Sequence, residues 1–327
     1  MNTIIRNIIL ALVFLVAGTG FSQKKDIEKA NKKFEKYAFI DAREIYLKVV
    51  EDGYESAQIF KNLGDTYYFN SEYGNAAKWY YKLVNKFPDQ TEPIYYYKAA
   101  QSLKSLGRNQ EAEALLKDYV AKGGTEFIVK SYIDDPEYLK SVVFESRELA
   151  VEKVSINTPT SDFGPAFYMN NRIIYASAGK NITPKFDDWS QEPYLDLFIS
   201  DRASDGTLKN SVRIGGDVNT DFNEATPTFS KDGNTMYFTR NQILEGKKDF
   251  DKSNKFKTLR LAVYKATRVG ENTWKNVVEL PFNSDTFSIA HPALSPDEKR
   301  LYFASDMPGT IGMSDIWYVD ILENNTY

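Results

Sequence analysis

Few side chains in this sequence are suited to chemistry. The 327 residues include one histidine, His291, and no cysteine. Without cysteine there is no disulfide, no thiol nucleophile and no thiolate metal ligand. His291 could complete a Ser-His-Asp triad, but the chain has no G-x-S-x-G turn, and this histidine lies between Ala290 and Pro292 inside a repeat. We therefore interpret His291 as a structural residue.

Acidic loops are the other candidates for a site. Asp187-Asp188 and the stretch DFDK at 249–252 are rich in carboxylate oxygens, the ligands that calcium prefers. Neither has the spacing and glycine of a calcium loop, which favours solvated loops. Asp306 and Asp315 are expected to cap turns between strands. The Gly-rich motifs of nucleotide sites do not occur, so we expect no enzyme, metal or cofactor.

The C-terminal half repeats one strand–turn–strand plan three times. In each copy a proline is followed two positions later by a large apolar residue, and the prolines are 62 and 65 residues apart. The markers are Pro165 with Phe167, Pro227 with Phe229, and Pro292 with Leu294. Repeats of this length made of meandering strands are typical of propeller blades.

Each repeat divides into apolar segments separated by turn residues. The expected strands of the first blade are 163–168, 172–178, 194–200 and 211–215; those of the second are 224–230, 235–240, 259–267 and 274–280. The third has three, near 291–295, 301–305 and 314–321. The alternating stretch Glu148–Ile156 predicts a further, early strand. A propeller closes with about four to eight blades, so we expect this one, over residues 148–327, to be partial and incomplete at its C-terminus.

The N-terminal half repeats at an offset of 34 residues. Ala30, Ala42 and Tyr46 recur as Gly64, Ala76 and Tyr80, and a third copy begins near residue 93. A helix–turn–helix period of this length is that of the tetratricopeptide repeat. The middle copy is similar to that family at Phe60, Leu63, Gly64, Tyr67, Ala76, Tyr80 and Pro88. The fold class that follows is α+β, with a tetratricopeptide α-solenoid of three helix pairs at 23–122 and a propeller of about three blades after it.

Such solenoids bind extended peptides or helices along one face. Residues that share a helix face by 3–4 spacing are candidates for that groove in the second and third repeats. They are Gln58, Lys61, Asp65 and Tyr68 in the second repeat, and Ile94, Tyr97, Gln101 and Lys104 in the third. The same face could equally be solvated surface or packing against a neighbouring domain.

The flanking segments suggest export. Residues 1–22 combine Arg6, an apolar run of 14 residues from Ile8 to Phe21 and the small-x-small site ending at Ser22, as a secretory signal peptide does. That run is too short for a membrane span, and no other stretch could cross one.

Residues 123–147 are expected to be a linker with a short capping helix that begins at Asp135. The net charge of −4 gives no reason to expect nucleic acid as a partner.

The third repeat resembles the TolB-type propeller repeat. The matching residues are Ser295-Pro296-Asp297, Lys299, Ser305-Asp306 and Asp315-Ile316-Trp317, with Glu298 in place of the usual glycine. Together with the helical repeats, the segments 161–168, 226–241 and 290–317 resemble the OmpA-family envelope proteins of the Bacteroidetes, including the PorE-like component linked to type IX secretion and gliding.

That resemblance implies a non-enzymatic, periplasmic scaffold or adaptor for protein partners of the outer membrane or cell envelope. In the family, peptidoglycan is bound by a C-terminal OmpA-like domain that has no counterpart among these residues. Two alternatives stay open at this point. The chain could be a glycan- or peptide-binding propeller module, which aromatic residues at a loop face would favour over aromatic residues between blades, or a truncated remnant of a larger OmpA-family protein.

Overall fold

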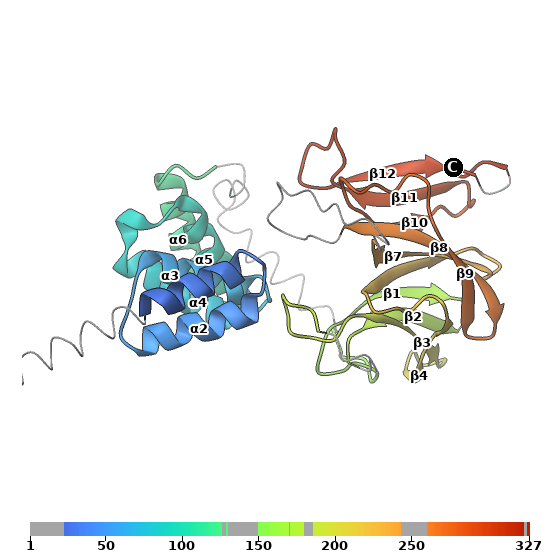
Figure 1. Ribbon diagram of the computed structural model, residues 1–327, viewed down its shortest axis with the longest axis horizontal. Coiled ribbons are helices and arrows are strands. Elements are labelled where there is room, and N and C mark those ends of the chain that lie inside the picture. Colours follow the sequence, from blue (N-terminus) through green and yellow to red (C-terminus); the bar gives the residue numbers. More distant parts are fainter. Residues whose placement is uncertain are drawn as a thin grey trace, which may run out of the picture. The chain divides into compact units, whose positions relative to one another are not determined.

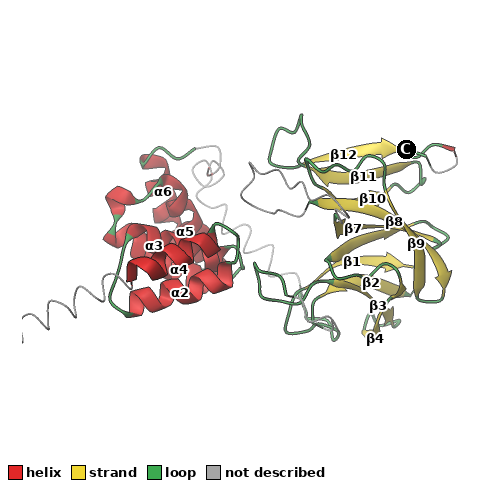
Figure 2. Ribbon diagram, in the orientation of Figure 1, coloured by secondary structure: helices red, strands yellow, loops and turns green. Residues whose placement is uncertain are grey.

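A computed structural model shows a chain of two compact units, one of helices and one of strands (Figure 2). The first consists of Met1–Val151 with Asp188–Gln191, and the second of Glu152–Asp187 with Glu192–Tyr327. The structure describes residues 23–125, 129, 150–169, 171–179, 186–242, 260–323 and 326–327. The α+β class is therefore confirmed. The predicted signal peptide at 1–22 and the capping helix at Asp135 lie outside the described residues.

The described part of the first unit contains six helices in three consecutive pairs (Figure 1). They are a helix over residues 23–34, α2 (Phe39–Glu51), α3 (Ala57–Tyr68), α4 (Tyr73–Lys86), α5 (Pro93–Ser105) and α6 (Asn109–Ala121), with a 3-10 turn η1 (Pro88–Gln90) before α5. Helix α3 begins after Ser56, whose hydroxyl accepts the Ile59 N–H at 3.3 Å. Pro93 is the first residue of α5, where its missing N–H costs no hydrogen bond.

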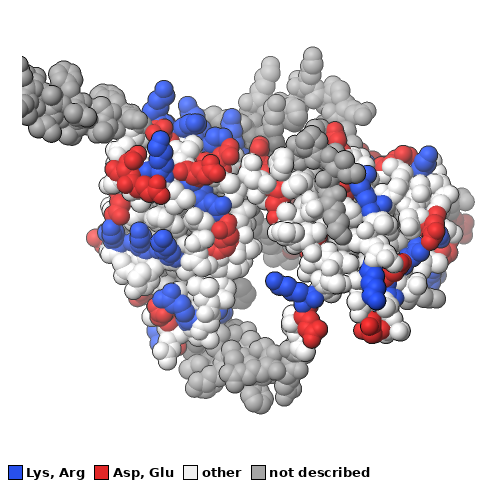
Figure 3. Space-filling model, turned by 90° about the horizontal axis from the view of Figure 1, so that it is seen from below, with Lys and Arg blue, Asp and Glu red and all other residues white. Residues whose placement is uncertain are grey.

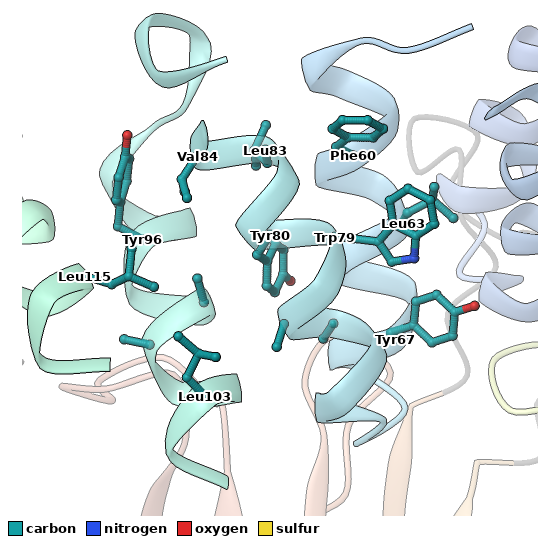
Figure 4. Close-up of a cluster of buried hydrophobic side chains, with 14 of the residues drawn as sticks. Phe60, Leu63, Tyr67, Trp79, Tyr80, Leu83, Val84, Tyr96, Leu103 and Leu115 are labelled. Carbon is teal, nitrogen blue, oxygen red and sulfur yellow. The ribbon is translucent and has the colours of Figure 1, made fainter. Parts of the chain in front are cut away.

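The core of the helical unit explains the alternation of small and aromatic residues in its repeats. A Cβ added to Gly64 would lie 2.2 Å from a ring carbon of Tyr80, so only glycine lets α3 and α4 pack this closely. Side chains of α3, α4, α5 and α6 then meet in one buried cluster (Figure 4). Phe60, Leu63 and Leu83 are almost completely buried in it. The small residue of the repeat at position 64 is thus explained by the close packing of the second helix pair.

The described residues of the second unit form three sheets (Figure 1). The first has the order β1-β2-β3-β4, made of β1 (Asp162–Tyr168), β2 (Arg172–Ser177), β3 (Asp196–Arg202) and β4 (Leu208–Arg213). The second has the order β5-β9-β8-β7-β6, made of β5 (Gly215–Gly216), β6 (Glu224–Phe229), β7 (Thr235–Asn241), β8 (Leu261–Gly270) and β9 (Thr273–Glu279). The third has the order β10-β11-β12, made of β10 (Ile289–Leu294), β11 (Arg300–Ser305) and β12 (Asp315–Asp320).

Two predictions about strands need correction. The expected strand at Glu148–Ile156 is wrong for its described part, because residues 150–156 form no strand. Its alternation buries no face, since Val151 is 91% exposed and Val154 is 45% exposed. The short strand β5, which pairs in parallel with β9, was not anticipated. Its two glycines carry no hydrophobic pattern from which a strand could be predicted.

The marker prolines lie within a β-bulge in β1, β6 and β10. The register shifts between Phe163 and Ala166 in β1, and at the equivalent places in β6 and β10. The residue before each proline has a positive φ: 63° at Gly164, 47° at Thr226 and 57° at His291. This backbone conformation is unusual for residues other than glycine, so the same bulge in three strands marks three copies of one structural unit.

The three sheets stack through two apolar cores. One core lies between the first and second sheets and includes Ile174, Leu197 and Trp274. The other lies between the second and third sheets and includes Tyr237, Val263 and Phe303. The middle sheet is thus covered on both faces, which matches the consecutive apolar residues Met236–Phe238 in β7 and Leu261–Tyr264 in β8.

Candidate interaction surfaces

Two of the predicted groove residues are part of the contact between helix pairs. Lys61 is 7% exposed, and its ammonium lies 2.5 Å from Glu92. Asp65 is 6% exposed and accepts a hydrogen bond from Lys98 of α5 at 2.6 Å. These side chains hold α3 to the start of the third helix pair and are not available to a partner.

Asp65 is the centre of a buried polar network. It also accepts the Tyr80 hydroxyl at 2.7 Å and the Tyr95 hydroxyl at 3.5 Å. Burial raises the pKa of Tyr80, and the neighbouring Asp65 carboxylate raises it further. The Lys98 ammonium lies 5.2 Å from the ring centre of Tyr95 and 4.8 Å from that of Phe69. Carboxylate, ammonium and rings together fix how the second and third pairs pack.

A similar, uncharged network joins the first and second pairs. The Asn62 amide donates to the Tyr46 hydroxyl, and that hydroxyl donates to Asn31, each at 2.6 Å. Burial raises the pKa of Tyr46 to about 12, and the hydrogen bond from Asn62 opposes this shift. Tyr46 therefore stays neutral and packs as part of the core.

The other predicted groove residues remain at least partly accessible. Gln58 is exposed and donates to Asn62 at 2.8 Å, while Tyr68 is half-buried. On α5, Ile94 is 43% exposed. Tyr97, Gln101 and Lys104 are half-buried on the same side of the helix. We call Ile94, Tyr97, Gln101 and Lys104 the α5 face.

The α5 face combines a fixed aromatic residue with polar groups. The Gln101 amide donates to the Tyr97 hydroxyl at 2.6 Å, and the Tyr97 ring packs at 5.7 Å from that of Tyr119. Partial burial lowers the pKa of Lys104. A face with an exposed aliphatic residue, an oriented hydroxyl and an amide suits a peptide or a helix better than it suits a small charged molecule.

The backbone of His291 forms part of the bulge of β10, and its side chain is exposed. Its backbone N–H donates to the Thr239 hydroxyl at 2.9 Å, and Thr239 is also 2.9 Å from the Thr226 hydroxyl. These contacts hold the bulge of β10 against the second sheet. Within the described ranges no three His, Cys, Asp or Glu side chains are grouped as metal ligands would be. The stretch 249–252 falls outside those ranges.

The predicted capping aspartates do cap loops. Asp306 accepts the Ser288 N–H at 2.6 Å, and Asp315 accepts the Ile311 N–H at 2.6 Å. Both carboxylates therefore order the ends of strands in the third sheet.

A buried charged pair, formed by Glu224 of β6 and Arg240 of β7, was not predicted from the sequence. Glu224 is fully buried, Arg240 is 4% exposed, and Arg240 Nε lies 2.9 Å from Glu224. Burial raises the pKa of Glu224 to about 7, although Arg240 and a hydrogen bond from Thr220 oppose this shift. A raised carboxyl pKa often marks a catalytic acid, but no substrate can reach this buried carboxyl. Glu224 and Arg240 meet because β6 and β7 place them opposite each other in the sheet, and no sequence motif marks such a pair.

Some aromatic residues of the strand unit lie between sheets, whereas Phe163, Phe167 and Phe186 are exposed. Tyr168, Phe229 and Trp274 form one cluster, with ring centres 4.9 to 5.7 Å apart. Phe282 and Phe303 stack at 5.2 Å in the other core. These rings fill the cores and do not form an aromatic loop face for a glycan.

Neither the surface charge nor the comparisons with known proteins assign this chain to a family. In the view of Figure 3, basic and acidic side chains are intermingled over both units. In the described residues no helix has both the length and the apolar character needed to cross a membrane. Neither a protein-family model nor a curated protein sequence matches this chain.

Proposed function

We propose that this protein is a non-enzymatic scaffold or adaptor that binds a protein partner through its helical unit. The helix pairs are assigned as tetratricopeptide repeats and the three sheets as propeller blades. The 34-residue offset and the Gly64–Tyr80 crossing support the first assignment. The repeated bulge around the marker prolines and the stacking of antiparallel meanders support the second.

The α5 face carries this proposal. It presents Ile94 at 43% exposure beside an oriented Tyr97–Gln101 pair, on a helix that the Asp65–Lys98 contact holds rigidly. A rigid, partly apolar face needs little reorganisation when it binds, which favours affinity for an extended segment or a helix of a partner. We place the partner in the cell envelope, in line with the signal-peptide pattern and the resemblance to OmpA-family and PorE-like proteins.

Site-specific crosslinking tests the proposal. A photoreactive amino acid at position 94 of the tagged protein is expected to give one dominant adduct with a defined envelope protein in the cells of origin. The same amino acid at position 81, where Tyr81 of α4 is 50% exposed, is the matched control and is expected to give none.

Point substitutions then separate binding from folding. Ile94→Glu should abolish co-purification of that partner from detergent-solubilised envelopes, whereas Tyr81→Glu should retain it. Equal recovery with both variants, or no adduct at position 94, would contradict the adaptor function of this face. Recovery in the periplasmic fraction, with the mature protein beginning near Gln23, would support the proposed location.

A further inference from the structure

The third sheet has a largely apolar face that no other sheet in the described chain covers, and at its edge the Arg300 guanidinium lies 4.5 Å from the ring centre of Tyr318. It consists of neighbouring side chains on β10, β11 and β12, which the strand register places on one side of the sheet. They are Ala293, Tyr302, Ala304, Ile316 and Tyr318. Ile316 is 82% exposed and Tyr318 is 51% exposed. We call these five residues the open face.

Residues equivalent to the open face make the contacts between sheets elsewhere in the protein. The bulges and registers align Ile174 with Tyr237 and Tyr302 in the second strands. Ile174 is fully buried against the second sheet, and Tyr237 is 2% exposed against the third, whereas Tyr302 is only half-buried. The strands β3, β8 and β12 show the same difference in burial. Leu197 and Val263 are fully buried, but the equivalent residue Ile316 is exposed.

The first sheet also has an exposed apolar region, on the side that faces away from the second sheet. Phe229 and Leu294 each pack against the core shared with the preceding sheet. Their equivalent in β1 is Phe167, which is 75% exposed. Further out on the same side of the first sheet, Tyr175 is 4% exposed and thus already covered within the chain. The uncovered part is therefore the half near the bulge, around Phe167.

We propose that a second copy of this chain covers the open face, with the third sheet of each copy packed on the Phe167 side of the first sheet of the other. The contact would reproduce, between chains, the interface that already occurs twice within the chain. The open face is also closest in character to the packing face of the first sheet. Ala293 and Ala304 match Ala166 and Ala176, whereas the second sheet has Thr228 and Thr239 in these places.

Two copies, each with the three sheets that the described residues form, give a ring of six. Propellers close with about four to eight blades, so this number allows closure without a free end. A head-to-tail contact that does not close produces filaments. The closed ring of six sheets depends on the proposed assignment of the sheets as propeller blades. The contact between two copies depends only on side chains that are equivalent to those between sheets within the chain. Neither depends on the α5 face, so a failure of one proposal leaves the other standing.

The mass of residues 23–327 in solution tests the inference. Light scattering on size-exclusion fractions should give twice the mass of one chain at micromolar concentration. Ile316→Glu should give the mass of a single chain with an unchanged far-UV spectrum, because this side chain contributes little to the fold of the monomer. The matched control is Ile311→Glu: this residue is 99% exposed in the loop before β12, outside the open face, and its variant should remain a dimer.

A mixing experiment identifies the geometry. Phe167→Glu alone should also be a monomer, but an equimolar mixture of the Phe167→Glu and Ile316→Glu variants retains one intact pair of faces and should form a dimer again. A dimer that is insensitive to Phe167→Glu would show back-to-back packing and overturn the head-to-tail arrangement. Filaments would overturn the closure. A wild-type protein that stays monomeric, or whose open face is covered by an envelope protein instead, would overturn the inference as a whole.

Discussion

The two units join their repeats by different chemistry. In the helical unit, neighbouring pairs share one apolar core and in addition meet through buried polar side chains such as Asp65 with Lys98 and Asn62 with Tyr46. In the strand unit, neighbouring sheets meet mainly through aliphatic and aromatic side chains, among them Ile174, Leu197 and Trp274.

The comparison suggests a division of roles. Buried polar contacts require one relative placement of their partners and lose much if that placement changes, so they specify register more than they add stability. Apolar faces stabilise in proportion to the area they bury but tolerate other partners of similar shape. The helical stack is thus built to hold a face rigid, and the strand unit to accept a further sheet.

Removal of a core aromatic residue from the strand unit should have the largest effect. Trp274 is fully buried, and Trp274→Ala is expected to lower the free energy of unfolding of this unit by about 4 kcal/mol, through lost burial and the cavity that remains. Differential scanning calorimetry should show the transition of the strand unit shifted down and that of the helical unit unchanged. An equal shift of both transitions would mean that the units do not unfold independently.

Loss of the helical ion pair should come next. Asp65→Ala leaves the Lys98 ammonium, which is only 16% exposed, without its carboxylate, and should destabilise the helical unit by about 3 kcal/mol. The double variant Asp65→Leu with Lys98→Met should recover most of this loss in urea denaturation, because no charge is left unpaired. Absence of recovery would assign the effect of Asp65 to its tyrosine partners instead.

The charged pair between sheets should give the strand unit a pH dependence. Glu224 has its pKa raised from 4.5 to about 7 in the folded protein, so folding favours its protonated form. Its contribution to stability is fully present below the unfolded pKa of 4.5 and falls as the pH rises through about 7. The loss amounts to roughly 3 kcal/mol, since one pKa unit corresponds to about 1.4 kcal/mol.

Glu224→Gln isolates this contribution. The slope of the free energy of unfolding of the strand unit between about pH 4.5 and 7 should become flatter in this variant than in the wild type. An unchanged slope would show that another group titrates in this range.

The smallest loss of stability is expected when a threonine hydroxyl that accepts a hydrogen bond between two sheets is removed. Thr239→Val removes the acceptor of the His291 N–H and should cost the strand unit about 1 kcal/mol, measured by denaturant unfolding. Thr228→Val, which removes the acceptor of the Leu294 N–H at 3.3 Å, serves for comparison and should cost no more. A loss as large as that of Trp274→Ala would mean that hydrogen bonds, and not apolar burial, hold the sheets together.

The sequence by itself determined the repeating elements. The glycine and aromatic positions around Gly64 and Tyr80, the turn residues and the three prolines at Pro165, Pro227 and Pro292 state local requirements of backbone and close packing. Such requirements act over a few residues, so the helix pairs and most strands could be predicted. The stretch Glu148–Ile156 was predicted wrongly because alternation alone does not supply the partner that a strand needs.

Only the tertiary structure decided which polar and apolar side chains face a neighbour. Lys61 and Asp65 share a helix face with Gln58, yet they are buried while Gln58 is exposed, because the third helix pair covers only part of that face. Tyr237 and Tyr302 occupy equivalent positions, and only the presence of a following sheet buries the first more deeply than the second. Burial depends on segments far away along the chain, and the pattern around a residue carries no information about them.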